Sequence, residues 1–203
     1  MLLCDIGNTT YHFLDKDKKY KYALDSFDPN SIDDKVYYIC VEPTLKETLK
    51  QLDNWIDISQ YIDINKYYST MGIDRIVACE AIEEGVIIDA GSAITVDLVK
   101  DGVFKGGFIY PGTRAMRDTY KNISSALDYE FNYDLDTSKL PKNSTDAISY
   151  GYLKLLYSEV NSYNIPVILT GGDADLLKKL FTDAEVNEDL IFDGMKKLIE
   201  TTA

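Results

Sequence analysis

The sequence predicts an α/β fold of two halves, each a mixed sheet flanked by helices. The first observation is a repeated plan: residues 2–10 and 86–95 each read as an apolar strand, then Asp, Gly and a hydrogen-bonding residue. The second is that strand-like runs and then helical patterns follow both copies. The third is that no linker rich in Gly, Ser or Pro separates them, so we expect halves 1–84 and 85–203 to pack closely around an interdomain cleft.

Composition places the chain among acidic globular proteins. Its 203 residues are 45% hydrophobic, enough to bury a core, and its net charge is −13. This charge argues against general affinity for nucleic acid or for anionic membranes. The sequence shows neither a basic leader with a long apolar core nor an apolar run of membrane-spanning length. We therefore expect a cytoplasmic protein with no nucleic-acid and no membrane partner.

The cysteines do not suggest a metal or redox site. Cys4, Cys40 and Cys79 form no CxxC pair, and two of them lie in apolar runs that read as strands. We expect all three to be buried, reduced thiols.

The first half reads as a strand meander followed by alternating elements. After the first strand and turn, alternation predicts the next two strands. Pro43 is suited to the first turn of a helix, and apolar residues at helical spacing follow the Gly-Ile-Asp-Arg sequence at 72–75. The expected elements are strands at 11–14, 20–24, 36–41 and 55–58, helices at 43–51 and 76–84, and a loop with short strand character at 59–70.

The second half repeats this order. Asp101-Gly102 is a strong hairpin signal between two strands, and Asn143 is a good cap for the long helix that follows it. The expected elements are strands at 86–90, 94–99, 103–109, 166–169 and 185–187, with helices at 112–127, 144–163, after 170–174, and at 189–200.

The turn after the first strand is a candidate phosphate loop. Gly7 permits close approach of the backbone to an anion, and the N–H groups of the next three residues can point at phosphate oxygens. Asp5, at the strand end, can hold Mg²⁺ through water. An ordinary hairpin turn is the alternative reading of this segment alone. The second copy pairs Asp5 with Asp89, Gly7 with Gly91 and Asn8 with Ser92, and favours the phosphate reading.

Arginine usage marks a second candidate site. Only three of the 21 basic residues are arginines: Arg75, Arg114 and Arg117. The planar fork of arginine binds carboxylate or phosphate in ways that lysine does not reproduce. We favour a functional role for Arg75 over one for Arg114 and Arg117, for which the alternative is that they face solvent on a helix.

Taken together, six motifs resemble those of the type III pantothenate kinases, in an order that covers nearly the whole chain. They are DIGNT, GIDR, DAGSAITVD, GGFIYPG, NSTDAISYG and TGGDA. The resemblance implies ribonuclease H-like (actin-like ATPase) halves and ATP-dependent phosphorylation of pantothenate to 4'-phosphopantothenate, the first step of coenzyme A biosynthesis. The chain departs from the family where Ser92 replaces a threonine and where the loop before GIDR has Tyr67 and Tyr68 but lacks the usual proline.

The resemblance also implies roles for individual residues. Asp74 would be the general base, and its alternative role is a helix cap or an ion pair with Arg75. Arg75 would bind the pantothenate carboxylate, and either Tyr67 or Tyr68 would contact substrate. The implied substrate-binding set is Tyr68, Gly72, Ile73, Asp74, Arg75 and Thr145. The implied ATP-binding set is Asp5, Ile6, Gly7, Asn8, Thr9, Thr10, Tyr11, His12, Ser92, Gly171 and Gly172.

Ions and a partner subunit are implied as well. Asp5 would hold Mg²⁺ through water and Asp89 would hold a monovalent cation, K⁺ or NH₄⁺. Thr145 would contact substrate from the neighbouring subunit of a homodimer, with a helix cap as its alternative role. His12, the only histidine, is better suited to packing in the hairpin than to chemistry.

Two other functions remain open at this point. One is a different small-molecule kinase of the same superfamily, such as a sugar kinase, although an arginine beside the base favours an anionic acceptor. The other is a regulatory or assembly protein that binds ATP without acting as a metabolite kinase.

Overall fold

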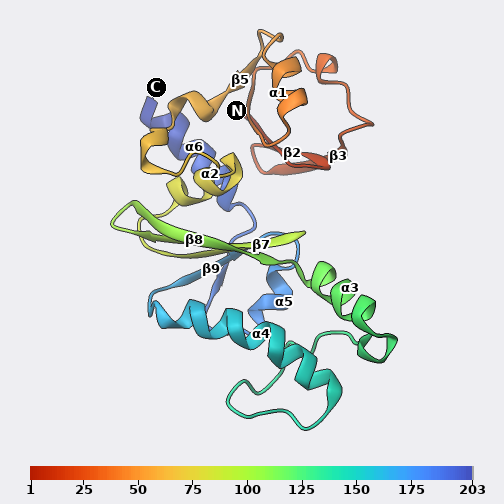
Figure 1. The fold of residues 1–203 in the computed structure, drawn as a ribbon. Helices are drawn as coiled ribbons and strands as arrows, with labels where there is room; N and C mark the ends of the chain where they lie inside the picture. Colours follow the sequence, from red (N-terminus) through yellow and green to blue (C-terminus); the bar gives the residue numbers. More distant parts are fainter. Residues whose placement is uncertain (203) are drawn as a thin grey trace. The chain divides into compact units, whose positions relative to one another are not determined.

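The structure, a computed structural model, describes residues 1–202, which fall into two compact units (Figure 1). Unit 1 comprises residues 1–82 together with the segment that begins at Asp189, and unit 2 comprises residues 83–188. The predicted halves, 1–84 and 85–203, are therefore corrected at the C-terminal side. Helix α6 (Leu190–Thr202) belongs to unit 1 because its apolar face packs there, and a sequence pattern does not show which sheet an amphipathic helix covers.

Unit 1 contains a five-stranded mixed sheet in the order β3-β2-β1-β4-β5. Its strands are β1 (Leu2–Ile6), β2 (Thr10–Asp15), β3 (Lys18–Ala23), β4 (Val36–Cys40) and β5 (Trp55–Asp57). The first three form an antiparallel meander, while β4 runs parallel to β1 and β5 parallel to β4.

Unit 2 repeats this sheet with the order β10-β9-β6-β7-β8. Its strands are β6 (Gly85–Ala90), β7 (Ala93–Lys100), β8 (Val103–Pro111), β9 (Val167–Thr170) and β10 (Glu185–Val186). Again three antiparallel strands are followed by two parallel additions. The predicted fold class, ribonuclease H-like halves that are each a mixed sheet flanked by helices, is confirmed for each unit.

Helices cover the sheets of both units (Figure 1). Unit 1 has α1 (Pro43–Leu49), α2 (Ile73–Ala81) and α6, with short 3₁₀ turns at Pro29–Ser31, Ile58–Tyr61 and Ile64–Lys66. Unit 2 has α3 (Thr113–Ile123), a 3₁₀ turn at Ser125–Leu127, α4 (Ser144–Ser162) and α5 (Ala174–Lys178). The expected strand character of 59–70 is wrong. Aspartates at 57 and 63 accept hydrogen bonds from the backbone two residues on, which starts a 3₁₀ turn each time.

Successive side chains of the central strands β1 and β6 point to opposite faces of each sheet, and this decides which face Asp5 and Asp89 occupy. On β1, Leu3 packs with α2 and α6, whereas Cys4 and Ile6 belong to the aromatic core on the other face of the sheet. On β6, Val86 and Ile88 pack against α4 and α5. Because successive side chains point to opposite faces, Asp5 lies on the face of Leu3, and Asp89 lies on the face of β6 turned away from α4.

The expectation of buried, reduced cysteines is confirmed. Cys4, Cys40 and Cys79 are all buried, and none forms a disulfide. Burial raises the pKa of Cys4 and, likewise, that of Cys40. Thiols in this environment are poor nucleophiles and poor metal ligands.

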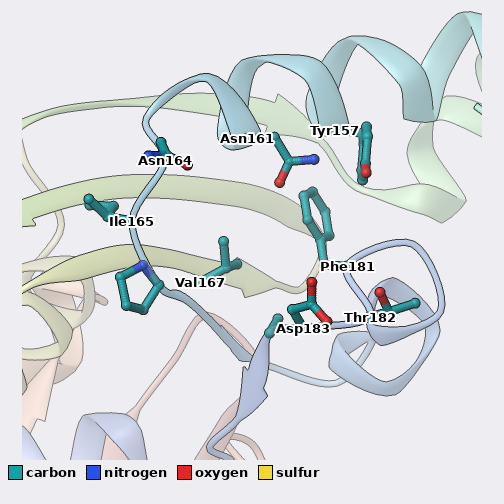
Figure 2. A pocket seen from close by; sticks show the side chains of 10 residues that line it. Tyr157, Asn161, Asn164, Ile165, Val167, Phe181, Thr182 and Asp183 are labelled. Atoms are coloured by element: carbon teal, nitrogen blue, oxygen red, sulfur yellow. The ribbon is translucent and has the colours of Figure 1, made fainter. Parts of the chain in front are cut away.

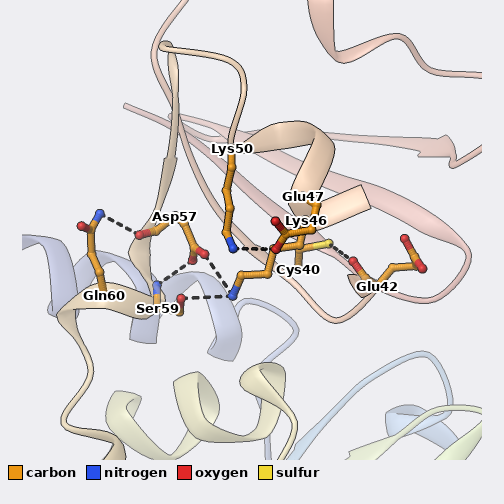
Figure 3. A network of polar contacts seen from close by, with 8 residues as sticks. All are labelled: Cys40, Glu42, Lys46, Glu47, Lys50, Asp57, Ser59 and Gln60. Atoms are coloured by element: carbon orange, nitrogen blue, oxygen red, sulfur yellow. Dashed lines mark hydrogen bonds and ion pairs between the residues drawn. The ribbon is translucent and has the colours of Figure 1, made fainter. Parts of the chain in front are cut away.

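A polar network ties α1 to the end of β5 (Figure 3). Lys46 Nζ lies 3.0 Å from Asp57 Oδ2 and donates to Ser59 Oγ at 3.2 Å. The other oxygen of Asp57 accepts from the backbone N–H of Ser59 at 2.9 Å. One carboxylate thus anchors a helix and begins a 3₁₀ turn.

Gly194 sets the close approach of α6 to α2. A Cβ added at Gly194 would lie 2.0 Å from the carbonyl oxygen of Val77, a backbone atom that cannot move aside without displacing α2. A glycine inside a helix is otherwise unfavourable, so this contact is the physical reason for it.

We expect Gly194→Ala to lower the free energy of unfolding by about 1–3 kcal/mol, the usual cost of overpacking. Chemical denaturation of the whole chain measures this. Gly151→Ala is the matched control, because a Cβ there meets only the Tyr120 hydroxyl at 3.5 Å, an ordinary contact, so helix propensity should leave stability unchanged or raised. Equal stability of the two variants would show that the α2–α6 contact does not require glycine.

Candidate active site

The turn between β1 and β2 offers backbone donors to an anion. Asp5 is the penultimate residue of β1, and the N–H of Gly7 closes the turn by donating to the carbonyl of Thr10 at 3.0 Å. Within residues 1–202, the N–H groups of Asn8 and Thr9 donate to no protein acceptor. Such uncommitted N–H groups in a glycine turn form a concave anion-binding site.

Several residues of this predicted loop contribute through the backbone only. Ile6 and Tyr11 are buried, and the Tyr11 ring packs against Phe27 with centroids 4.7 Å apart. Their side chains belong to the core. The His12 ring lies edge-on to Phe192 of α6, with centroids 5.0 Å apart, so it packs between the hairpin and the helix.

The turn between β6 and β7 repeats the first with one residue fewer. Asp89 is the penultimate residue of β6, and Gly91 donates to the carbonyl of Ala93 at 3.0 Å. Seven positions separate Asp5 from its partner across the hairpin, His12, whereas six separate Asp89 from Thr95. The N–H of Ser92 donates to no acceptor within residues 1–202, so this second turn also presents a backbone donor.

The turn after β9 packs directly on Asp89. Gly171 has a φ of +85°, and an added Cβ would lie 2.3 Å from Asp89 Oδ1 and 2.7 Å from the carbonyl oxygen of Ala90. The N–H of Asp173 donates to that same carbonyl at 2.9 Å. A Cβ added at Gly172 meets nothing within 4 Å, so this glycine borders open space.

A third segment, Gly112-Thr113, completes this cluster. A Cβ at Gly112 would lie 2.2 Å from the carbonyl oxygen of Ser92, and Thr113 Oγ1 donates to Asp173 Oδ2 at 2.6 Å. The structure therefore gathers Asp89, Ser92 and the Gly171-Gly172 turn in unit 2. The one available sequence signal was the Pro-Gly-Thr run at the start of α3.

The Gly-Ile-Asp-Arg segment forms the N-terminus of α2. Gly72 is the N-cap residue, and Asp74 Oδ1 accepts from the backbone N–H of Arg75 at 2.8 Å. A Cβ at Gly72 would lie 2.4 Å from the same carboxylate oxygen, so the glycine leaves room for the Asp74 side chain. Within residues 1–202, Oδ2 of Asp74 accepts no hydrogen bond.

The contacts of Arg75 distinguish Tyr68 from Tyr67. Its side chain is buried, 6% exposed, and Nη1 donates to the hydroxyl of Tyr68 at 2.6 Å, with the guanidinium 5.8 Å from the ring centroid. Tyr67 instead donates to Glu80 Oε1 at 2.9 Å, towards the other end of α2. The structure thus places Tyr68, Asp74 and Arg75 together and directs Tyr67 elsewhere.

The remaining candidates have local contacts. Thr145 lies in the first turn of α4, where its carbonyl accepts from Ser149 Oγ at 2.8 Å, while Asn143 caps the helix through the N–H of Asp146 at 2.9 Å. On α3, Arg114 is exposed and Arg117 pairs with Glu130. These two arginines therefore match the solvent-facing alternative.

No group of three or more His, Cys, Asp or Glu side chains among residues 1–202 is arranged to hold a metal ion. Asp5 and Asp89 each offer one carboxylate at a strand end beside uncommitted N–H groups. That donor set fits an ion whose remaining ligands are water and phosphate oxygens, as is usual for Mg²⁺ in kinases.

A cavity of about 560 Å³ in unit 2 lies away from these residues (Figure 2). Its lining comes from the end of α4, the segment before β9 and the segment after α5, including Tyr157, Asn161 and Phe181. Val167 at this end of β9 pairs with Val86, whereas Thr170 at the other end pairs with Asp89. The cavity is thus at the opposite end of β6 and β9 and contains none of the predicted site residues.

Among residues 1–202, no helix combines the length and the apolar character needed to cross a bilayer.

Comparison with known proteins gives matches to a family model over most of the chain and to curated relatives over 98% of it. Residues 37–164 match the family model described as type III pantothenate kinase. The chain is 60% identical to a type III pantothenate kinase of Sulfurimonas denitrificans, over 98% of each chain, and 41% identical to one of Campylobacter jejuni, over 98% of this chain and 97% of that one. A solved structure from Campylobacter jejuni, described as a conserved putative Baf family transcriptional activator, superposes with a TM-score of 0.86 at 38% identity, covering 100% of this chain and 98% of that one.

Gly171→Ala tests whether the turn after β9 holds the Asp89 carboxylate. The new Cβ meets both a positive φ and the carboxylate oxygen, so we expect a loss of stability of about 1–3 kcal/mol and weaker nucleotide binding. Thermal unfolding and calorimetric titration with an ATP analogue measure the two effects. Gly172→Ala is the control for stability, because its Cβ has open space. Unchanged unfolding of Gly171→Ala would contradict the close contact.

Proposed function

The chain belongs to the type III pantothenate kinase family, and we propose from this premise that it transfers the γ-phosphoryl group of ATP to the primary hydroxyl of pantothenate. The product would be 4'-phosphopantothenate, and the reaction would be the first step of coenzyme A biosynthesis. The observation that carries this proposal is the 60% identity, over 98% of both chains, to a protein named for that activity. The kinase reaction uses ATP and pantothenate as substrates and, like other kinases, a metal ion.

Asp74 is proposed as the general base. One of its oxygens is fixed by the N–H of Arg75, which orients the carboxylate at the start of α2. The other oxygen is available to accept the hydroxyl proton as the phosphoryl group transfers. A base held in this way needs little reorganisation during the reaction.

Arg75 is proposed to bind the pantothenate carboxylate. Its guanidinium is buried and positioned by Tyr68, so the fork is already oriented before an anion arrives. Gly72 and Ile73 would line the same site as neighbours in the segment. Tyr68, held on Arg75, is the tyrosine we assign to substrate contact.

The two glycine turns are proposed to bind the phosphates of ATP. In unit 1 the segment from Asp5 to His12 supplies the N–H groups of Asn8 and Thr9, and in unit 2 Ser92 supplies its own. Gly171 and Gly172 would accept the adenosine part against the backbone, which is supported by the open space at Gly172.

Two ions are proposed as cofactors: Mg²⁺, held by Asp5 through water, and a monovalent cation, K⁺ or NH₄⁺, held by Asp89. When bound, these ions supply positive charge that stabilises the phosphates during transfer. The protein's part is to place one carboxylate at the end of each central strand.

We also propose a homodimer in which Thr145 contacts substrate in the neighbouring subunit, and a cytoplasmic location. Both rest on the family. The net charge of −13 supports the absence of a nucleic-acid partner.

The description of the Campylobacter jejuni structure as a putative transcriptional activator favours one second candidate, an ATP-binding regulatory protein without metabolite kinase activity. A further alternative is a different small-molecule kinase of the superfamily. An acceptor screen with ATP, Mg²⁺ and K⁺ separates the three. If sugars are phosphorylated and pantothenate is not, the protein is a different small-molecule kinase. If no acceptor is phosphorylated, the result favours the ATP-binding regulatory protein.

Asp74→Asn is expected to lower kcat for pantothenate phosphorylation by at least about a hundredfold, because the amide cannot accept the proton. A coupled assay for ADP release measures kcat, and calorimetry with an ATP analogue measures nucleotide binding. Binding should stay within about twofold of the unmodified chain. If kcat is retained, Asp74 is not the base.

Tyr68→Phe is expected to raise KM for pantothenate about tenfold with a smaller change in kcat, because Arg75 loses the hydroxyl that orients it. Tyr67→Phe is the matched control. It removes a hydroxyl that contacts Glu80, so KM should be unchanged while stability falls slightly. The reverse pattern would reassign substrate contact to Tyr67.

A further inference from the structure

A row of oxygen-bearing side chains crosses the sheet of unit 2 at Asp89. Thr95 of β7 is the partner of Asp89 on one side, and Thr170 of β9 is its partner on the other. Residues directly opposite each other on neighbouring strands carry their side chains on the same face, close enough to interact. The three residues therefore present hydroxyl, carboxylate and hydroxyl side by side.

The apolar neighbours identify which face this is. Ile94 and Val96, on either side of Thr95 in the chain, are buried in the core that α4 and α5 cover. By alternation, Thr95 points to the opposite face, together with Asp89. The row belongs to the end of β6 from which the Gly91-Ser92 turn projects.

Thr95 has a buried hydroxyl without a partner. Its Oγ1 is inaccessible to solvent and makes no hydrogen bond within residues 1–202. Buried hydroxyl groups are almost always hydrogen-bonded, and an exception calls for an explanation such as a missing ion or water. Here the orphaned atom is next to a carboxylate that the proposed function assigns to a monovalent cation.

The chemistry of the row suits an ion of charge +1. One carboxylate matches a single positive charge, and neutral oxygens such as hydroxyl or carbonyl groups are the ligands that K⁺ accepts in place of its hydration shell. A site for a divalent ion made by protein alone would need more carboxylates, and no such cluster occurs among residues 1–202.

We propose that Thr95 Oγ1 is a second protein ligand of the monovalent cation held at Asp89. This inference rests on the proposed function, because it needs a cation at that carboxylate. The hydroxyl oxygen would donate a lone pair to the ion, and its proton would remain free for a water or phosphate oxygen. Thr95 thus sets the affinity for the cation, whereas Asp89 supplies the charge.

Thr95→Val is the direct test, because valine keeps the shape and removes the hydroxyl. The melting temperature is followed during titration with K⁺, at constant ionic strength maintained with tetramethylammonium chloride, in the presence of Mg²⁺ and a non-hydrolysable ATP analogue. We expect the half-saturating K⁺ concentration to rise at least about tenfold in Thr95→Val and to stay within about twofold in Thr95→Ser. Thr119→Val, which removes a hydroxyl bonded within exposed α3, should match the unmodified chain.

Each outcome bears on the proposal. An unchanged K⁺ dependence in Thr95→Val overturns it, and the hydroxyl then serves a water molecule. If the melting temperature of the unmodified chain does not depend on K⁺, the proposed cation site at Asp89 is wrong, and so is this inference. The assay of pantothenate phosphorylation then shows separately whether the proposed kinase activity is correct. Should Thr95→Val not fold, Thr95→Ala is judged by the same criterion.

Discussion

The contact between the Asp89 carboxylate and the backbone of Gly171 is the constraint on which the proposed site in unit 2 depends. Residue 171 cannot carry a side chain without moving the carboxylate, since a Cβ there would lie 2.3 Å from Asp89 Oδ1. The same turn is held to β6 by the hydrogen bond from Asp173 to Ala90. A strand end, a helix start and a carboxylate are thereby fixed in one arrangement. Since protein interiors resist small displacements, this packing gives the Asp89 carboxylate of the proposed site a fixed position.

The two units show how one sheet topology yields two related but different turns. In both, the carboxylate is the penultimate residue of the central strand and a glycine N–H closes the turn two residues later. The additional residue in the first turn adds one backbone N–H group, whereas the second turn is shorter and packs closely against Gly112 and Gly171. Unit 1 therefore offers one more backbone donor, and unit 2 packs its carboxylate against Gly171.

Much of the fold could be predicted from sequence because its signals are local. The Asp101-Gly102 turn, with both φ angles positive, and the Asn143 cap follow from the chemistry of two to four neighbouring residues. The packing of α6 on unit 1 could not be predicted, because the apolar face of an amphipathic helix does not show which of the two sheets it covers. The same limit applies to the site. Adjacent Tyr67 and Tyr68 look equivalent in sequence, and only the direction of each side chain assigns one to Arg75 and the other to Glu80. Thr95 was similarly hidden, since its significance lies in strand register.

The placement of α6 has a consequence for synthesis of the chain. The core beneath α2 is completed by Phe192, Met195 and Leu198, which the ribosome adds only after all of unit 2. Unit 2 is continuous, so it can fold as it emerges, whereas unit 1 must wait with an exposed apolar face. Until α6 is synthesised, the nascent polypeptide is thus open to chaperone capture and aggregation through the uncovered apolar face of unit 1.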